Sequence, residues 1–292
     1  MTVGRTRSRR SFVVRRNRTD NVLNHFSGRL RGYLIFAGSV LVLVAVWQIA
    51  ASIVGLDIIL PRPASVLREL VLVPSQPGFL QSLEATIARG ISGFLLSAAV
   101  GFAVGLLTGL SRNAESAFRP VLTLIQSTPV MSVILLALIW FQTGGVPVFV
   151  AFLMSFPVIA LNVGRGVREV DPQLVEMAKA FKLKGARVLG RLYIPSLSPY
   201  LVAAASISVG LTWRVVIAAE VLSQPVFGIG TQLQQARVEL ETARVFAWTA
   251  VAVILTGGSD LLFYLFSRLI KRRRDSSAAT ASKSLPKGSV GA

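Results

Sequence analysis

Side chains that could carry acid–base, nucleophilic or metal chemistry are scarce in this sequence. It contains no cysteine, and its one histidine, His25, lies in a polar stretch near the N-terminus. Disulfides, thiolate metal sites and cysteine nucleophiles are therefore excluded. A histidine-based metal centre or catalytic triad is close to excluded. We expect this chain to carry no metal, no cofactor and no catalytic residue.

Two ionisable residues stand inside the same long apolar segment, 200–222, where a charge is costly and marks a functional candidate. Arg214 could contact an anionic substrate, or it could pair with a carboxylate on another segment, such as Asp260. Glu220 lies nearer the end of the same segment as Arg214. The carboxylates at membrane depth are few and scattered, which makes an embedded enzyme a weak alternative.

A polar cluster that begins at Gln126 comes directly before Pro129. A proline frees backbone carbonyls, so such a cluster can line a cavity through which a solute passes. It could equally be a kink whose polar groups satisfy their own backbone. The candidates for a translocation path are Gln126, Thr128, Pro129, Arg214 and Glu220.

The segments that hold these side chains are long and apolar enough to be membrane-spanning helices. Hydrophobic residues make up 53% of the 292 residues and the mean hydropathy is +0.64. Charged residues make up 15%, where a soluble domain has about 25%. A span needs about 20 apolar residues. We predict an all-α integral membrane protein whose six helices cover approximately 32–54, 88–110, 120–141, 146–163, 200–222 and 246–269.

Small residues recur in the second of these spans. Gly101, Gly105 and Gly109 are four residues apart, so they fall on one face of the helix. Small residues at this spacing allow two helices to approach closely. We expect close packing here rather than contact with a substrate.

The net charge of +18 is concentrated in the tails and in one central loop. Basic residues are not interleaved with aromatic residues on a folded surface, so nucleic acid is not an expected partner. Most of the 31 lysines and arginines fall on one side of the predicted spans, which places both termini in the cytoplasm. We expect a basic tail over 1–31, a transmembrane domain over 32–270 and a basic, disordered tail over 271–292.

The loop between the fourth and fifth spans, 171–195, is too long for a simple connection. Asp171 is suited to cap a helix that begins at Pro172. We expect Gly185 to break this helix and Pro195 to end a second, short basic helix. One apolar stripe repeats at helical spacing: Leu174, Met177, Ala178 and Phe181.

This loop resembles the EAA motif of permease subunits of bacterial, binding-protein-dependent ABC importers. Glu176 is followed by Met177 and Ala178, and Pro195 comes nineteen residues after the glutamate, as in the family. The glycine that the family has six residues after the glutamate is replaced by Lys182, and Gly185 follows three residues later.

The resemblance implies a type I importer fold in which this loop couples the permease to separate ATPase subunits. The implied coupling residues are Glu176, Met177, Ala178, Phe181, Lys182, Gly185 and Pro195. The implied partners are two ABC ATPase subunits that hold ATP and magnesium, a second permease subunit (most simply a copy of this chain) and an extracytoplasmic substrate-binding protein. The sequence itself has no G-x-x-x-x-G-K-[ST] phosphate loop, and the implied location is the bacterial inner membrane.

Further segments are similar to the nitrate, sulfonate and taurine branch of that family. They are Trp213–Leu222, Gly228–Gly230 and Thr242–Ala247. The branch implies transport of a small solute such as nitrate, a sulfonate, taurine or a small vitamin precursor. A membrane anchor or signalling subunit without transport is the alternative, because it would explain the spans but not the coupling-type loop.

Overall fold

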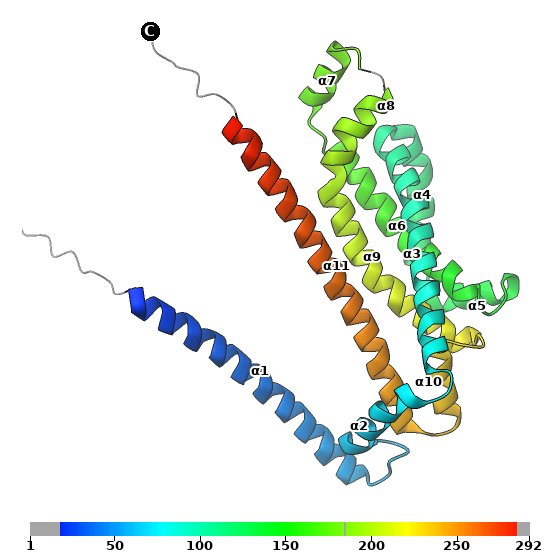
Figure 1. Cartoon of the computed structure of the whole chain (residues 1–292). Helices are drawn as coiled ribbons and strands as arrows, with labels where there is room; N and C mark the ends of the chain where they lie inside the picture. The colour runs from blue at the N-terminus through cyan, green and yellow to red at the C-terminus, as the bar shows by residue number, and fades with distance from the viewer. Residues whose placement is uncertain (1–17, 184, 285–292) are drawn as a thin grey trace, which may run out of the picture. The chain divides into compact units, whose positions relative to one another are not determined.

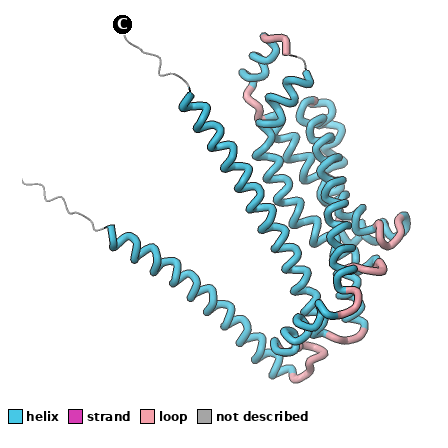
Figure 2. Tube along the Cα trace, in the orientation of Figure 1, coloured by secondary structure: helices cyan, strands magenta, loops and turns pink. Residues whose placement is uncertain are grey.

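The computed structural model describes residues 18–183 and 185–284, with side chains over 34–269 except at 179, 184 and 186. All regular structure in these residues is helical (Figure 2). The chain divides into two units, Met1–Leu56 and Asp57–Ala292, and each is described by itself.

The first unit contains one helix, α1, from Arg18 to Val54. Its part from Leu34 to Val54 is long and apolar enough to cross a membrane. The basic tail expected over 1–31 is therefore partly helical, since α1 begins at Arg18. The preceding residues, 1–17, lie outside the described part of the chain.

The second unit consists of ten α-helices in its described residues, joined by short turns (Figure 1). A 3₁₀ turn, Val73–Ser75, follows the first of them, and a π-helical turn, Leu189–Tyr193, precedes α9. The helices are α2 (Pro63–Leu72), α3 (Phe79–Leu110), α4 (Arg112–Ser127), α5 (Val130–Trp140), α6 (Val146–Arg168), α7 (Pro172–Ala180), α8 (Gly185–Val188), α9 (Ile194–Ser223), α10 (Ile229–Val238) and α11 (Thr242–Ser284).

Helices α3, α6 and α9 form the centre of this unit, and glycines on α3 let α6 approach. A Cβ atom added at Gly101 would lie 2.8 Å from the carbonyl oxygen of Phe156, and one at Gly105 would lie 2.6 Å from that of Ala160. One at Gly109 would meet a side chain of α6 at 2.5 Å. The close packing predicted from the glycine spacing is confirmed, because no side chain larger than hydrogen fits at these positions.

The third predicted span, 120–141, is not one straight helix. It consists of α4 and α5, which meet at an angle of 100° across Thr128 and Pro129. Proline lacks the N–H that would continue the helix and forces the preceding residue toward extended backbone, and Thr128 has φ −75° and ψ 129°. Within the described residues, five continuous helices are long and apolar enough to span a membrane, and this bent pair supplies the sixth span if it counts as one.

The short helices of the second unit gather at its two ends. Helices α7 and α8 lie at one end of α6 and α9, whereas α2 and α10 lie at the other (Figure 1). The α7–α8 segment follows the fourth predicted span, and α10 follows the fifth. They therefore lie at opposite ends of the same bundle.

Helix α11 extends beyond the predicted sixth span. Its backbone stays helical to Ser284, so the disordered tail expected over 271–292 is corrected in its first part. Arginine, lysine and alanine in this stretch all have high helix propensity, which a reading based on the loss of apolar periodicity overlooks. Residues 285–292 lie outside the described residues.

Candidate functional site

The loop between α6 and α9 begins as the sequence predicts. Helix α7 starts at Pro172, and the Asp171 carboxylate accepts a hydrogen bond from the backbone N–H of Gln173 at 2.8 Å. This bond satisfies one of the free amides at the helix start. Asp171 and Pro172 thus fix where the segment that follows α6 turns into a helix.

The helical path after α7 is broken at Lys182. From the sequence we expected this break at Gly185. Lys182 has φ +50°, in the left-handed region, and the N–H of Leu183 donates to the carbonyl of Ala178 at 3.1 Å. This is the Schellman arrangement that ends a helix, in which glycine is the preferred residue at the left-handed position. Lys182 therefore stands where the family has its glycine, while Gly185 begins α8.

Pro195 was expected to end a short basic helix, but it does not. It lies in the first turn of α9, and the chain is helical without interruption from Gly185 through the π-helical turn into α9. Proline is tolerated in a first turn because its missing N–H would have no partner there. The end of the coupling segment is thus continuous with a membrane helix.

The predicted apolar stripe of α7 is mostly exposed. Leu174, Met177 and Phe181 are 39%, 51% and 73% exposed, and Ala178 faces inward at 4%. Glu176 is also exposed. Exposed large apolar side chains gathered on one helix face are typical of an interaction surface.

Glu220 lies at the opposite end of the unit, fully buried in a hydrogen-bond network. Its carboxylate accepts from Nη1 of Arg89 at 2.7 Å and from Oγ1 of Thr86 at 2.9 and 3.0 Å. It also accepts from the N–H of Gly230 at 3.0 Å, in the first turn of α10. One carboxylate therefore joins α3, α9 and α10.

The two partners from α3 extend the network to the chain that precedes α10. Arg89 also donates from Nη1 to the carbonyl of Phe227 at 2.7 Å, and Thr86 accepts from the N–H of Ile229 at 2.9 Å. The predicted role of Glu220 in a translocation path gains no support from these contacts. Burying a charge is tolerable when it is paired and hydrogen-bonded, and these contacts give Glu220 a structural role.

Thr86 and Arg89 are functional neighbours that the sequence did not reveal. Both precede or border the predicted start of the second span at 88, whereas α3 begins at Phe79. They are three residues apart, so they share a helix face. Their contacts with Glu220 join residues 134 and 131 positions apart in the chain, so no local sequence pattern indicates them.

Arg214 remains a candidate at membrane depth. It is exposed, and no ion pair joins it to Asp260 among the described residues. The two groups nevertheless converge on Gly210, where an added Cβ would lie 3.7 Å from Nη2 of Arg214 and 3.3 Å from Oδ1 of Asp260. The pairing considered from the sequence therefore does not form, and the guanidinium stays available.

The polar cluster at the bend between α4 and α5 is partly self-satisfied. The hydroxyls of Ser127 and Thr128 donate to the carbonyl of Leu124 at 3.0 and 2.8 Å. This matches the interpretation of a kink that satisfies its own backbone. Gln126 is exposed, and its amide has no hydrogen-bond partner among the described residues. Of the cluster, only Gln126 offers free polar atoms.

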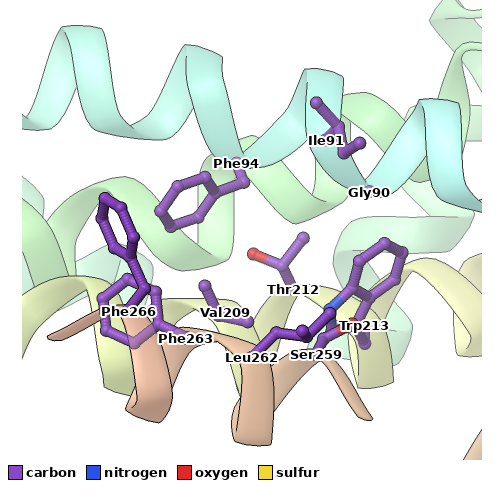
Figure 3. Close-up of a pocket in the computed structure, with 10 residues that line it drawn as sticks. All are labelled: Gly90, Ile91, Phe94, Val209, Thr212, Trp213, Ser259, Leu262, Phe263 and Phe266. Carbon is purple, nitrogen blue, oxygen red and sulfur yellow. The ribbon is translucent and has the colours of Figure 1, made fainter. Parts of the chain in front are cut away.

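A cavity of about 350 Å³ opens between α3, α9 and α11 (Figure 3). Trp213 packs against Gly90 at one end, where an added Cβ would lie 2.3 Å from the indole ring. The hydroxyl of Thr212 on its wall is already bonded to Ser155 at 3.0 Å. None of the predicted path residues lines this cavity and no charged group does, so it offers no site for an anion.

Residues 99–276, more than half of the chain, match the model of the family described as binding-protein-dependent transport system inner membrane component. This chain belongs to that family. The matched residues include α6, the α7–α8 segment and α9, so the EAA-type resemblance and the family match fall on the same part of the molecule.

Curated relatives of this permease are ABC transporter permeases. It is 28% identical over 255 residues to the putative aliphatic sulfonates transport permease protein SsuC of Bacillus subtilis, covering 85% of this chain and 89% of that protein. It is 26% identical to the bicarbonate transport system permease protein CmpB of Synechococcus elongatus, covering 86% and 92%. It is 27% identical to the taurine transport system permease protein TauC of Escherichia coli, covering 81% and 86%.

Solved structures share the fold of this permease. The inward-facing MetNI methionine ABC transporter matches with a TM-score of 0.57 at 17% identity, covering 65% of this chain and 95% of that one. An amino acid ABC transporter matches with a TM-score of 0.56 at 18% identity. The permease therefore has the type I ABC importer fold. Its family and its relatives are ABC transporter permeases, non-enzymatic transport subunits whose ATPase is a separate partner.

Proposed function

We propose that the α7–α8 segment is the surface through which this permease receives motion from an ATPase partner. The observation that carries the proposal is the exposed stripe of Leu174, Met177 and Phe181 on a capped, well-defined helix. A rigid amphipathic helix of this kind fits a groove on a partner, with apolar anchors for affinity and charges for orientation. The capped start and the helical continuity into α9 would pass that motion to a membrane helix.

The assembly we propose has two permease subunits, most simply two copies of this chain, with two ATPase subunits and an extracytoplasmic binding protein. The α7–α8 end and both termini lie in the cytoplasm of a bacterium, with the chain in its inner membrane. The basic tails and loops support this orientation, because lysine and arginine concentrate on the cytoplasmic side. ATP and magnesium belong to the partner chains.

The substrate we propose is a small anion. Its support is that the named relatives transport sulfonates, bicarbonate and taurine, and that Arg214 is exposed at membrane depth with no ion pair. A guanidinium suits a sulfonate, carboxylate or similar oxyanion, since its planar N–H groups match two oxygens at once. Gln126 could add a neutral contact along the path.

Coupling is tested by co-purification of the tagged permease with its candidate ATPase, together with the ATPase rate of the complex. Phe181→Glu and Glu176→Lys should lose the ATPase, because each places a wrong charge on the docking face. The matched control is Val238→Glu, an equally exposed apolar residue on α10 at the opposite end of the unit. It should keep the complex intact.

Retention of the ATPase by both α7 variants would contradict the coupling role. Assembly of the wild-type complex without any ATP-dependent uptake would favour an anchor or signalling subunit. Uptake is measured with radiolabelled taurine and bicarbonate in proteoliposomes that contain the complex and its binding protein. An anion-binding role of Arg214 predicts that Arg214→Gln abolishes uptake while ATPase assembly persists.

A further inference from the structure

A second cavity lies between α3, α4 and α6, close to the start of the coupling segment. Its volume is about 340 Å³. Unlike the apolar cavity near Trp213, its wall carries three arginines against one glutamate. These charged residues are Arg119, Arg165, Arg168 and Glu115.

Two of the arginines in this cavity have no partner of their own. Arg168 is held in place, because its Nη1 lies 3.1 Å from Oε2 of Glu115 and donates to the carbonyl of Thr108 at 3.2 Å. Arg119 and Arg165 form no ion pair or side-chain hydrogen bond among the described residues. The cavity thus contains a fixed ion pair and two free guanidinium groups.

The rest of the wall combines apolar side chains with two threonines, Thr108 and Thr123. Leu122 and Leu161 line the cavity, and Leu122 is almost completely buried. The neighbouring surface of α4 carries Val121 and Leu124, 50% and 67% exposed. A ligand that fits both parts has an anionic head and an apolar remainder.

We propose that this cavity binds a phosphate group, with the headgroup of an anionic phospholipid as the source that the exposed apolar side chains of α4 favour. Paired guanidinium groups are suited to phosphate oxygens, and basic pockets between membrane helices on the cytoplasmic side bind such headgroups. The cavity would lie on that side in the orientation proposed above, so its sidedness rests on the proposed function. The binding chemistry of the cavity does not rest on the proposed function.

The position of the cavity connects it to coupling. Arg165 and Arg168 lie in the last turn of α6, and α7 begins at Pro172. An anion bound there would neutralise the positive charge of the arginines at the end of α6. This end directly precedes α7, the proposed ATPase-docking helix. A bound anion would therefore fix the position of the chain where the α7–α8 segment begins.

The proposal is tested by native mass spectrometry of the purified full-length chain, titrated with phosphatidylglycerol and with phosphatidylcholine. The wild type should bind phosphatidylglycerol more tightly. Arg119→Gln and Arg165→Gln should each weaken that binding about fivefold, the effect of one basic residue at a membrane surface, and the double variant should remove the preference. The matched control is Arg112→Gln, an exposed arginine at the start of α4 that does not line the cavity.

Inorganic phosphate added to the wild type separates the two sources of the anion. Displacement of phosphatidylglycerol by millimolar phosphate would support the site with free phosphate as its ligand, and resistance would support the lipid. An unchanged lipid preference in the double variant, or an equal loss in Arg112→Gln, would overturn the proposal. The measurement needs no ATPase, so a failure of coupling leaves it interpretable.

Discussion

Glu220 shows how one buried carboxylate can organise three helices of a membrane protein. Glu220 lies on α9, and its partners come from α3 and from the first turn of α10. An amide at a helix start carries partial positive charge, so Gly230 and Arg89 both compensate the carboxylate. Removing Arg89 leaves the buried charge of Glu220 less compensated. Removing the carboxylate of Glu220 leaves Arg89 and the N–H of Gly230 without their acceptor.

We expect Glu220→Ala and Arg89→Met to destabilise the permease by about 3–5 kcal/mol, the cost of breaking a buried ion pair. Thermal unfolding in detergent, followed by tryptophan fluorescence, measures the loss. Arg237→Gln is the control, because Arg237 lies on exposed α10 surface and bonds only to neighbouring Gln234. Equal stability of all three variants would mean that the network contributes nothing.

Lys182 has a left-handed backbone conformation at the end of α7. A left-handed residue with a side chain costs roughly 1–2 kcal/mol that glycine does not pay. Lys182→Gly should therefore slow amide exchange of Leu183, whose N–H closes the helix end. Lys182→Ala should not, since alanine keeps the strain. Hydrogen exchange with mass spectrometry distinguishes the two, and identical exchange in both variants would refute the argument.

Contact between α3 and α6 depends on a row of glycines, because the facing atoms at Gly105 include backbone that cannot rotate away. Gly105→Ala should destabilise the helix pair by about 1–3 kcal/mol, the usual cost of overpacking. Ala103→Val, on the exposed side of α3, is the matched control and should be neutral. Melting temperatures in detergent compare them. A neutral Gly105→Ala would show that α6 can move aside.

The helices differ in how well their sequences predict them. The apolar segments, the glycine face of α3 and the cap at Asp171 were predictable because each follows from local chemistry. A kink at Pro129 was one of two interpretations of the sequence, but its angle of 100° was not predictable, since a hydropathy window cannot distinguish a bent pair from a straight span. The break at Lys182 and the full length of α3 were not predicted either. The partners of Glu220 could not be predicted either, because an ion pair between residues more than a hundred positions apart depends on the fold.

Considered as a whole, the permease presents different chemistry at its two ends. One end carries the apolar stripe of α7 and the arginine-rich cavity, and the other carries the buried network around Glu220 and α10. The surface proposed for attachment to a motor and the buried network of Glu220 are thus separated along the bundle. The sidedness of these ends decides whether the α7 stripe can meet a cytoplasmic ATPase.

That sidedness can be measured directly because the sequence contains no cysteine, so one introduced thiol is the only labelling site. We place it at Gln235 on α10 or at Asn113 at the start of α4, both exposed. The positive-inside rule predicts that a membrane-impermeant maleimide labels Gln235→Cys in intact spheroplasts. It should label Asn113→Cys only after permeabilisation. The reverse pattern would place the α7–α8 segment outside the cell and remove the basis of the coupling proposal.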